Sequence, residues 1–332
     1  MSKTYRILSI DGGGIKGIYS AALLAKLEEL TDKKITDCFD LITGTSTGGL
    51  IALFLGAGYS PKEIVDFYKK NASVIFPKDK KDSLLKKVLG KPKFDNVNLE
   101  KVLVEYLKDK KMKDSIVNLC IPAVDSDNEE PIVFKTGHSP IYVRDPEIPM
   151  LEIAMATSAA PTYLPKYKIR HINRTAVDGG LSANNPSLIG VIEALLLFVG
   201  NNKSYDNFSL LSIGNIEYNT GCFDSLQSGI CDKFKKIKFT QKLIDLFMKI
   251  QGKTTSNMVG LIAAATESKY KRISNNDIAA GQHSKIKLDS SNDAVLELLI
   301  SKGYSDAEHN LKDINNNNML EVKCSRAQEV KW

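Results

Sequence analysis

The chain has 332 residues, of which 43% are hydrophobic and 25% charged, a composition typical of globular proteins and unlike that of disordered or collagen-like chains. Its five cysteines are scattered and odd in number, with no Cys-x-x-Cys pair, which excludes a disulfide framework and a zinc motif and favours a reducing, cytoplasmic compartment. The net charge of +6 is too small to indicate a nucleic-acid polymer as partner.

The chain opens with a predicted strand–helix–strand unit. Residues Tyr5–Ile10 are rich in isoleucine and leucine, as in a buried strand, and this run is too short for the apolar region of a signal peptide. From Ile18 to Leu30 apolar residues recur at helical spacing, and Phe39–Ile42 is a second short apolar strand. Together they predict a βαβ unit with parallel strands.

The second strand leads into a glycine-flanked turn, Gly44-Thr45-Ser46-Thr47-Gly48, which matches G-x-S-x-G. A serine at the apex of a sharp strand-to-helix turn has a strained backbone and an exposed hydroxyl, and the flanking glycines let neighbouring chain pass without a clash. The apolar helix that starts near Thr47 points its N-terminal amides at the same spot. We interpret Ser46 as a nucleophile, and a plain glycine-rich turn is the alternative.

Helices and strands alternate up to Gly214. Ser60-Pro61 predicts a helix start, because serine is a good N-cap and proline fits the first helical position. The most apolar window, 188–200, is short and contains Glu193, so no transmembrane helix is expected. The further predicted helices are 61–71, 99–107, 151–158 and 186–198, and the further predicted strands are 116–124, 132–135, 175–178 and 209–213. This alternation predicts an α/β protein whose mostly parallel sheet is covered on both faces.

Beyond Gly214 the pattern changes but no linker or repeat separates the two parts. We therefore expect residues 196–332 to complete the same globule as a catalytic core spanning 6–195. The predicted elements there are a basic helix at 233–250, an apolar helix at 254–266, short strands at 270–273 and 286–288, a helix at 293–302, and a polar tail that begins with the asparagine run 315–318.

The glycine loop, residues 11–17 (Asp-Gly-Gly-Gly-Ile-Lys-Gly), allows three interpretations. It matches the dinucleotide fingerprint, but that site requires an acidic residue at the end of the second strand, where Thr43-Gly44-Thr45-Ser46 stands. It also suits an oxyanion hole, in which the backbone N–H groups of Gly12, Gly13 and Gly14 bind a tetrahedral intermediate and Lys16 adds positive potential. A tight structural turn through Gly17 is the third.

A serine nucleophile requires a base. Asp178 ends an apolar strand and is followed by Gly179 and Gly180, so its carboxylate is placed at the carboxyl edge of the sheet, where ligands of open α/β sheets bind. We predict Asp178 as the base, and a simple Asp-Gly-Gly turn is the alternative. A conventional Ser-Asp-His order is the other possibility and requires His283 or His309; surface or structural roles are expected for the four histidines, His138, His171, His283 and His309.

The glycine loop, the Gly44–Gly48 turn and Asp178-Gly179-Gly180, in this order, resemble the patatin-like phospholipase family. Residues 154–165 and Asn184-Asn185-Pro186 are similar to family sequence too, so the resemblance covers roughly Arg6 to Leu195. It implies a three-layer α/β/α fold, and a lipid acyl hydrolase with a Ser46–Asp178 dyad. It also implies an oxyanion hole of the Gly12, Gly13 and Gly14 amides.

The resemblance implies further properties. The substrate it implies is a membrane phospholipid, and it implies that the reaction requires no metal or organic cofactor. Some bacterial members similar in size and architecture are antiviral effectors switched on by cyclic nucleotides, which implies such an activator here. A homo-oligomer is a further possibility. The rival functions are a dinucleotide-dependent enzyme that uses the glycine loop and a non-catalytic storage or interaction protein with this fold.

The basic helix predicted at 233–250 suggests contact with a membrane. From Lys233 to Lys249 there are six lysines and one aspartate. Apolar side chains gather on one face of this helix, namely Phe234, Ile237, Leu243, Ile244, Phe247, Met248 and Ile250. A basic amphipathic helix of this kind can lie among lipid head groups, and the lysine-rich stretch 77–93 adds further positive charge. The alternative is that the apolar face packs on the sheet.

Overall fold

A central sheet organises the computed structural model, which describes residues 3–77, 92–216, 233–274, 289 and 291–322 and, for 233–242, the backbone alone. In these residues eight strands form one sheet in the order β5-β6-β3-β2-β1-β7-β8, with β4 paired to β3 off this path. The strands are β1 Thr4–Ile10, β2 Leu41–Gly44, β3 Asn118–Asp125, β4 Glu130–Lys135, β5 Tyr167–Ile169, β6 Arg174–Asp178, β7 Asn207–Ile213 and β8 Lys269–Ile273.

The middle of the sheet is parallel, as predicted. Strand β1 pairs in parallel with β2 on one side and with β7 on the other, and β8 continues the parallel order beyond β7. Successive side chains of β1 alternate between the two faces: Ile7 belongs to one core cluster, Leu8 and Ile10 to the other. A strand covered on both faces requires such a continuous apolar run.

Two strands approach each other end to end beside β3. The first residues of β3 pair in parallel with β2, Thr43 opposite Cys120, whereas its last residues pair with the antiparallel strand β6, Asp178 opposite Ala123. The carboxyl end of β2 and the carboxyl end of β6 therefore face one another across a short gap. The antiparallel direction of β6 departs from the expected parallel strand end, and it brings the residues after β2 close to Asp178.

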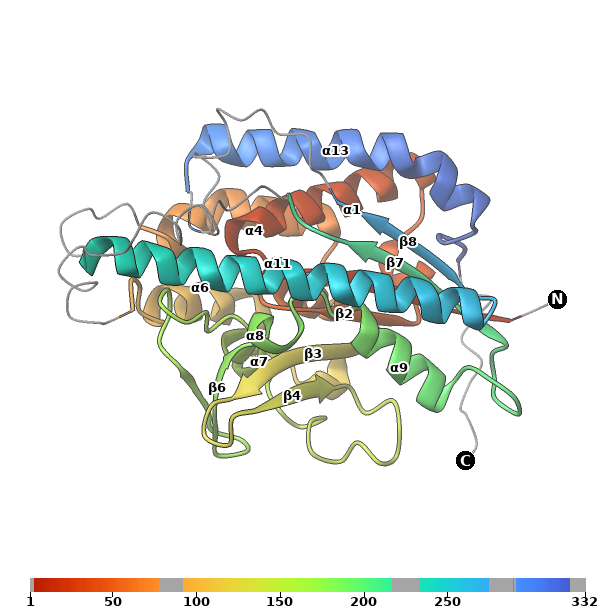
Figure 1. Ribbon diagram of the computed structural model, residues 1–332, viewed down its shortest axis with the longest axis horizontal. Helices are drawn as coiled ribbons and strands as arrows, with labels where there is room; N and C mark the ends of the chain where they lie inside the picture. The colour runs from red at the N-terminus through yellow and green to blue at the C-terminus, as the bar shows by residue number, and fades with distance from the viewer. Residues whose placement is uncertain (1–2, 78–91, 217–232, 275–288, 290, 323–332) are drawn as a thin grey trace.

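Helices cover both faces of the sheet, which gives the predicted α/β layers (Figure 1). One core cluster joins the sheet to α1, α3, α4, α6, α7 and α13, and the other joins it to α9 and α11. The helices are α1 Gly17–Thr31, α2 Ile35–Cys38, α3 Thr47–Gly56, α4 Pro61–Ile75, α6 Val97–Leu107, α7 Met150–Thr157, α8 Gly180–Ala183, α9 Ser187–Leu197, α11 Lys233–Ala265 and α13 Asp293–Asn316, with 3₁₀ turns at Gly14–Lys16 and Met112–Asp114. Among the described residues no helix offers an apolar stretch long enough to cross a membrane.

The predicted cap of α4 is present. The backbone N–H of Glu63 donates to the Ser60 hydroxyl oxygen at 3.3 Å, and the backbone N–H of Ser60 donates to the Glu63 carboxylate at 2.7 Å. This reciprocal pair satisfies two amide groups that a helix start otherwise leaves without partners, and Pro61 follows at the first helical position.

Two predictions for the C-terminal part were wrong. The helices expected at 233–250 and 254–266 are one helix, α11, which continues through Gly252 because this stretch is packed: Gly252 is buried and Gln251 Oε1 accepts from the N–H of Asn184 at 2.8 Å. The helix expected at 293–302 continues as α13 into the asparagine run, because α13 packs against α1 (Figure 1), with Asp306 accepting a 2.6 Å hydrogen bond from Tyr19. The strand predicted at 286–288 and most of the lysine-rich stretch 77–93 lie outside the described residues.

Candidate active site

Ser46 lies at the apex of the turn between β2 and α3, as its sequence pattern predicts. Its φ of 54° and ψ of −121° are unusual for a residue with a side chain, as expected for a strained turn. The residue is only 7% exposed, because it faces a pocket and not the open surface that the pattern predicts. The turn is tight because two glycines permit it. A Cβ built on Gly44 would lie 2.1 Å from the carbonyl oxygen of Gly48, and one on Gly48 would lie 2.3 Å from that of Ile10.

The Ser46 hydroxyl donates to the Asp178 carboxylate, with 2.5 Å between Oγ and Oδ2. Asp178 comes from the end of β6, which meets the end of β2 beside β3. Its other oxygen, Oδ1, accepts a 2.7 Å hydrogen bond from the N–H of Gly180, which fixes the orientation of the carboxylate. Gly179 permits the approach, because a Cβ there would lie 2.3 Å from the carbonyl oxygen of Pro122.

Burial raises the pKa of the Asp178 carboxyl from 3.8 to about 6, while the hydrogen bonds from Ser46 and Gly180 counteract part of this rise. A carboxylate with a pKa near neutrality is a stronger base than an exposed one and is still ionised at pH 7. The pair therefore has both the distance and the proton affinity that a serine–aspartate dyad requires.

The glycine loop lies beside this pair. Gly13 and Gly14 line the same pocket as Ser46, and in the described part of the chain no hydrogen bond uses the N–H of either residue. The Gly14 φ of 60° is a conformation that favours glycine. The N–H of Gly12 instead donates to the carbonyl oxygen of Asn184 at 3.0 Å, so only two of the three predicted oxyanion donors are available in this structure. Lys16 lies in the following 3₁₀ turn and does not line the pocket.

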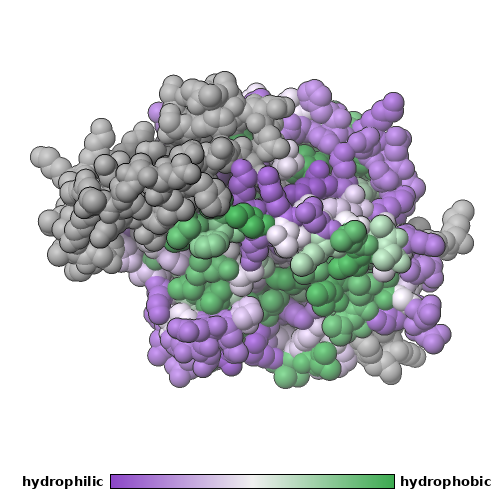
Figure 2. Space-filling model, viewed as in Figure 1, coloured by the Kyte–Doolittle hydropathy of each residue, from purple (hydrophilic) through white to green (hydrophobic). Residues whose placement is uncertain are grey.

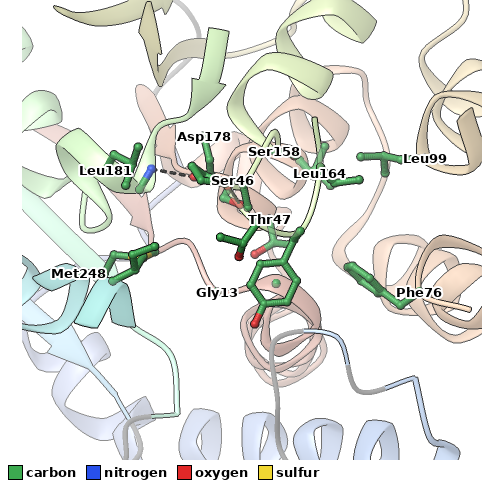
Figure 3. Close-up of a pocket in the computed structure, with 18 of the residues that line it drawn as sticks. Gly13, Ser46, Thr47, Phe76, Leu99, Ser158, Leu164, Asp178, Leu181 and Met248 are labelled. Carbon is green, nitrogen blue, oxygen red and sulfur yellow. Dashed lines mark hydrogen bonds between the residues drawn. The ribbon is translucent and has the colours of Figure 1, made fainter. Parts of the chain in front are cut away.

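An apolar pocket opens from the dyad. Figure 3 shows Ser46 and Asp178 in its middle, Leu181 and Met248 on one side and Phe76 and Leu99 on the other. Its lining comes mainly from aliphatic and aromatic side chains, including Leu50, Tyr68, Ile75, Tyr163, Leu164 and Ile244. A pocket of this kind suits a hydrocarbon chain whose ester group reaches Ser46.

The apolar residues of 233–250, predicted to face a membrane, point in two directions in the structure. Ile244 and Met248 of α11 line the pocket, whereas Phe247 and Ile250 are exposed. The side chains of Phe234 and Ile237, like the lysines before residue 243, lie outside the description. Part of this face thus covers the dyad, and another part faces outward.

Several residues that hold the site lie outside the glycine loop, the Gly44–Gly48 turn and Asp178-Gly179-Gly180. The N–H of Ser46 donates to Thr157 Oγ1 at 3.0 Å, and the N–H of Asn184 donates to Gln251 Oε1 at 2.8 Å. The Asn215 amide donates to the carbonyl oxygen of Gly12, and Arg272 pairs with Asp11 at the start of the glycine loop. All four partners lie far along the chain from the residue they hold, so residue spacing gives no signal for them.

Comparison with known proteins now identifies the chain's family. A family model described as patatin-like phospholipase matches residues 8–190, which include both members of the dyad and the whole glycine loop.

The chain belongs to this family.

Relatives of two kinds share its sequence. A cGAMP-activated phospholipase of Vibrio cholerae is 37% identical over 202 residues, 57% of this chain and 57% of the relative. A second protein of that name, from Escherichia coli, is 35% identical over 220 residues, 64% of this chain and 62% of the relative. Patatin-like protein 2 of Oryza sativa subsp. indica is 30% identical over 318 residues, 82% of this chain and 76% of the relative. The chain thus spans about three fifths of the length of the bacterial relatives.

The described histidines lie apart from Ser46. None of His138, His171 and His309 lines the pocket, and His283 lies outside the described residues. His309 Nδ1 lies 2.6 Å from the carbonyl oxygen of Ser305 in its own helix α13. The expected surface or structural role of the described histidines fits these positions.

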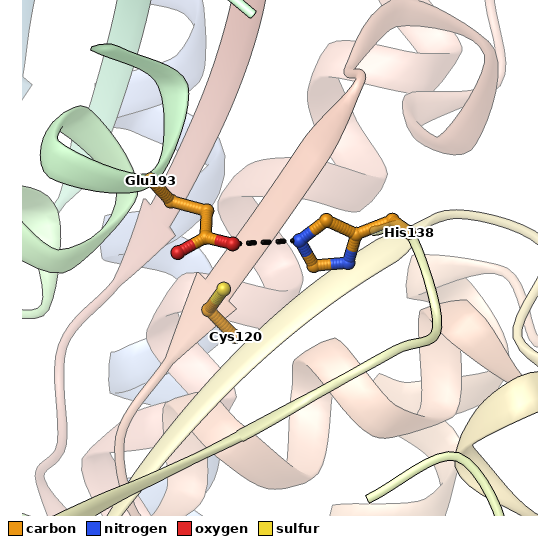
Figure 4. A group of neighbouring side chains, drawn as sticks. All are labelled: Cys120, His138 and Glu193. Atoms are coloured by element: carbon orange, nitrogen blue, oxygen red, sulfur yellow. Dashed lines mark hydrogen bonds and ion pairs between the residues drawn. The ribbon is translucent and has the colours of Figure 1, made fainter. Parts of the chain in front are cut away.

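A second group of polar side chains lies between β3, α9 and the loop after β4 (Figure 4). Cys120, His138 and Glu193 bring ligand atoms within 4.8 Å of one another, a spacing that a metal ion could bridge. The Glu193 carboxylate, however, already accepts hydrogen bonds from Lys135 Nζ at 2.6 Å and Tyr142 OH at 2.5 Å and lies 2.9 Å from His138 Nε2. Burial alone raises the pKa of Glu193, but these three partners lower it to about 2. The contacts make a self-contained ion-pair network, and the absence of a metal cofactor stays a prediction.

Proposed function

We propose that this protein hydrolyses acyl esters of membrane phospholipids through an acyl-Ser46 intermediate. The observation that carries the proposal is the 2.5 Å contact between Ser46 Oγ and Asp178 Oδ2 in an apolar pocket. A strained serine beside a base is the arrangement of a covalent acyl transferase or hydrolase, and the apolar lining suits a fatty acyl chain. The family membership and the names of its relatives support the same activity.

In the first half of the reaction Asp178 takes the proton of Ser46 as Oγ attacks the ester carbonyl carbon. The negative charge that develops on the carbonyl oxygen is stabilised by the N–H groups of Gly13 and Gly14. When the intermediate collapses, the C–O bond to the alcohol breaks and Asp178 returns its proton to the departing oxygen. Lysolipid leaves and Ser46 carries the acyl group.

In the second half a water molecule replaces the alcohol. Asp178 accepts a proton from this water as its oxygen attacks the acyl carbon, and the same N–H groups stabilise the second tetrahedral intermediate. Collapse releases the fatty acid and returns the proton to Ser46. One carboxylate thus acts as the base for both attacks, and no imidazole is needed.

The proposal is tested by labelling with a fluorophosphonate probe and by mass spectrometry of phospholipids incubated with the protein. Wild type should take up the probe and release fatty acid, and Ser46→Ala should do neither while keeping its melting temperature. Ser158→Ala is the matched control, because Ser158 is a second buried serine of the same pocket and should keep the label. Undiminished labelling of Ser46→Ala would exclude the mechanism.

The dinucleotide alternative has less support. The glycine loop borders an apolar pocket that also contains the dyad, whereas a nucleotide would place its phosphates and ribose against polar groups. A non-catalytic role is also less supported, because both Ser46 and Asp178 are present and within hydrogen-bond distance. Absence of probe labelling together with binding of NAD would favour the first alternative.

We further infer that a cyclic nucleotide activates the enzyme. The support is the 35–37% identity to relatives named cGAMP-activated phospholipases. Ester hydrolysis by the purified protein, measured with and without cyclic GMP–AMP and a panel of other cyclic nucleotides, tests the inference. An equal rate in all samples would contradict it.

The substrate implies contact with a membrane surface, and α9 and α11 offer one. Figure 2 shows apolar side chains gathered over the face on which these helices lie in Figure 1. The exposed apolar residues there are Ile192 and Leu196 of α9 and Phe247, Ile250, Met258 and Leu261 of α11. Since α11 also lines the pocket with Met248, we propose that this face rests on the bilayer and passes lipid to Ser46.

A further inference from the structure

The carboxylate of Asp11 lies buried directly beneath the glycine loop, with 5% of its side chain exposed. It follows the last residue of β1 and precedes Gly12, and its own N–H donates to the carbonyl oxygen of Ile213 in β7 at 3.0 Å. A buried carboxylate is costly unless a charged or hydrogen-bonding partner compensates it. The nature of that partner decides what the carboxylate does for the loop.

The partner is Arg272, which comes from β8 at the other side of β7. Its Nη2 lies 2.7 Å from Asp11 Oδ2 and its Nη1 lies 3.2 Å from Asp11 Oδ1, while Nη1 also donates to Ser212 Oγ at 2.8 Å. Two parallel bonds between a planar guanidinium and a carboxylate fix orientation as well as distance. Gly214 makes room for the fork, because a Cβ there would lie 2.7 Å from Arg272 Nη2.

We propose that Arg272 is a positioning residue of the active site, which acts through Asp11 to hold the oxyanion donors Gly13 and Gly14 in place. The proposal rests on the proposed function, because it assigns Arg272 a part in that reaction. Arg272 lies outside the 8–190 range of the family match, so the C-terminal part of the chain completes the site. Asn215, which follows β7, also holds the glycine loop through its hydrogen bond to the carbonyl oxygen of Gly12.

The physical reason is the short range of oxyanion stabilisation. Donors must meet the developing charge at hydrogen-bond distance, and a displacement of about 1 Å can lower the rate by about 10²-fold. Asp11 is two and three residues before the two donors, so a rotation of its carboxylate or backbone is passed directly to them. Substrate binding in the apolar pocket does not depend on this contact.

The test compares Arg272→Gln and Arg272→Lys with a matched control, Lys271→Gln. Lys271 is the neighbouring residue of β8 and its Nζ pairs with Asp313 at 2.7 Å on the surface, so the control also removes a cation and an ion pair from the same strand. We expect kcat for a short-chain p-nitrophenyl ester to fall about 10- to 10²-fold in Arg272→Gln, with KM within twofold of wild type. The rate of inactivation by a fluorophosphonate should fall in parallel.

Arg272→Lys keeps the positive charge and so is expected to fold, but it cannot form the bidentate contact and should recover only part of kcat. Asp11→Asn combined with Arg272→Gln should be no slower than Arg272→Gln alone, because both changes break one interaction. Lys271→Gln should keep the wild-type kcat.

Three results would overturn the inference. The first is a kcat of Arg272→Gln equal to that of Lys271→Gln, and the second is a change in KM with no change in kcat. The third is a wild-type kcat in Arg272→Lys. Each of these results would show that the reaction does not require a bidentate contact to hold the loop. These outcomes require an active wild type. If wild type itself neither hydrolyses ester nor takes up the probe, the proposed function has failed instead.

Discussion

Burial of the Asp178 carboxylate is expected to lower the stability of the folded protein. Burial raises the pKa of Asp178 from 3.8 to about 6, so above pH 6 the folded protein holds a desolvated charge that the unfolded chain exposes to water. A shift of roughly two units at about 1.4 kcal/mol each corresponds to about 3 kcal/mol of lost stability. Asp178→Asn removes the charge and keeps the shape, so it should raise stability by up to this amount at pH 7.5.

The stability difference between Asp178→Asn and wild type depends on pH. Between pH 3.8 and about 6 the folded protein retains a proton that the unfolded chain has released, so the stability of wild type falls as pH rises through this window. Below pH 3.8 both states are protonated and Asp178→Asn should equal wild type. For a chain of 332 residues, about 3 kcal/mol corresponds to a rise in Tm of about 4 °C.

The assay is thermal unfolding of both proteins at a series of pH values from 4 to 8, together with ester hydrolysis. Activity should move in the opposite direction: kcat of Asp178→Asn should fall by about 10²-fold or more, and wild-type kcat/KM should rise with pH through about 6. Equal Tm differences at pH 4 and pH 7.5, or a less stable variant at pH 7.5, would refute the reasoning.

Asp125 provides a control, because its replacement by asparagine should change stability in the opposite direction. It is buried, which raises its pKa, but hydrogen bonds from Asn128 and two backbone N–H groups and the charge of Arg174 outweigh burial and lower the pKa. Its ionised form therefore stabilises the fold above its unfolded pKa, and this stability is lost as pH falls through the folded pKa. Asp125→Asn should lower Tm at pH 7.5.

Three further predictions concern the loop, the histidines and the membrane face. Gly13→Ala should lower kcat about 10²- to 10³-fold, because its Cβ would lie 2.2 Å from Asn215 Nδ2 and displace an oxyanion donor; wild-type turnover with a normal melting curve would contradict this. Replacing any of the four histidines by alanine should leave most ester hydrolysis, and a loss as large as that of Asp178→Asn would indicate a conventional triad. Leu261→Glu should weaken co-sedimentation with anionic vesicles about tenfold, as expected for the loss of one leucine side chain buried in the bilayer. The control is Val97→Glu, a change of an exposed apolar residue of α6, which should not weaken co-sedimentation. Equal effects of the two changes would exclude α11 as the membrane contact.

Sequence could predict the parts of the site that local geometry defines. Ser46 requires flanking glycines at fixed offsets, and Asp178 requires close backbone approach on its C-terminal side, so both leave a pattern in a few consecutive residues. The structure places the two side chains together, as the pattern predicts. The parallel middle of the sheet follows likewise from apolar runs that alternate with amphipathic helices.

Other features depend on distant contacts and could not be predicted. The direction of β6 is set by its pairing with the second half of β3, and nothing in its own sequence distinguishes a parallel from an antiparallel strand. Gly252 resembles a helix end in sequence, yet α11 continues through it where it is buried against distant parts of the chain. Arg272 resembles any other arginine in a basic segment until the fold brings it to Asp11, 261 residues away.

The order of strands in the sheet also determines when during synthesis the sheet around the glycine loop can form. Strand β1 is central, but its partner β7 follows 203 residues later in the chain, and β8 later still. Until the ribosome has delivered them, one edge of β1 stays unpaired and the face of α1 that α13 covers stays open. Pairings so distant in sequence form slowly. A partly synthesised chain that already carries Ser46 and Asp178 but not yet β7 and β8 thus lacks the strands beside its glycine loop, and the loop can be held in place only after these strands have been made.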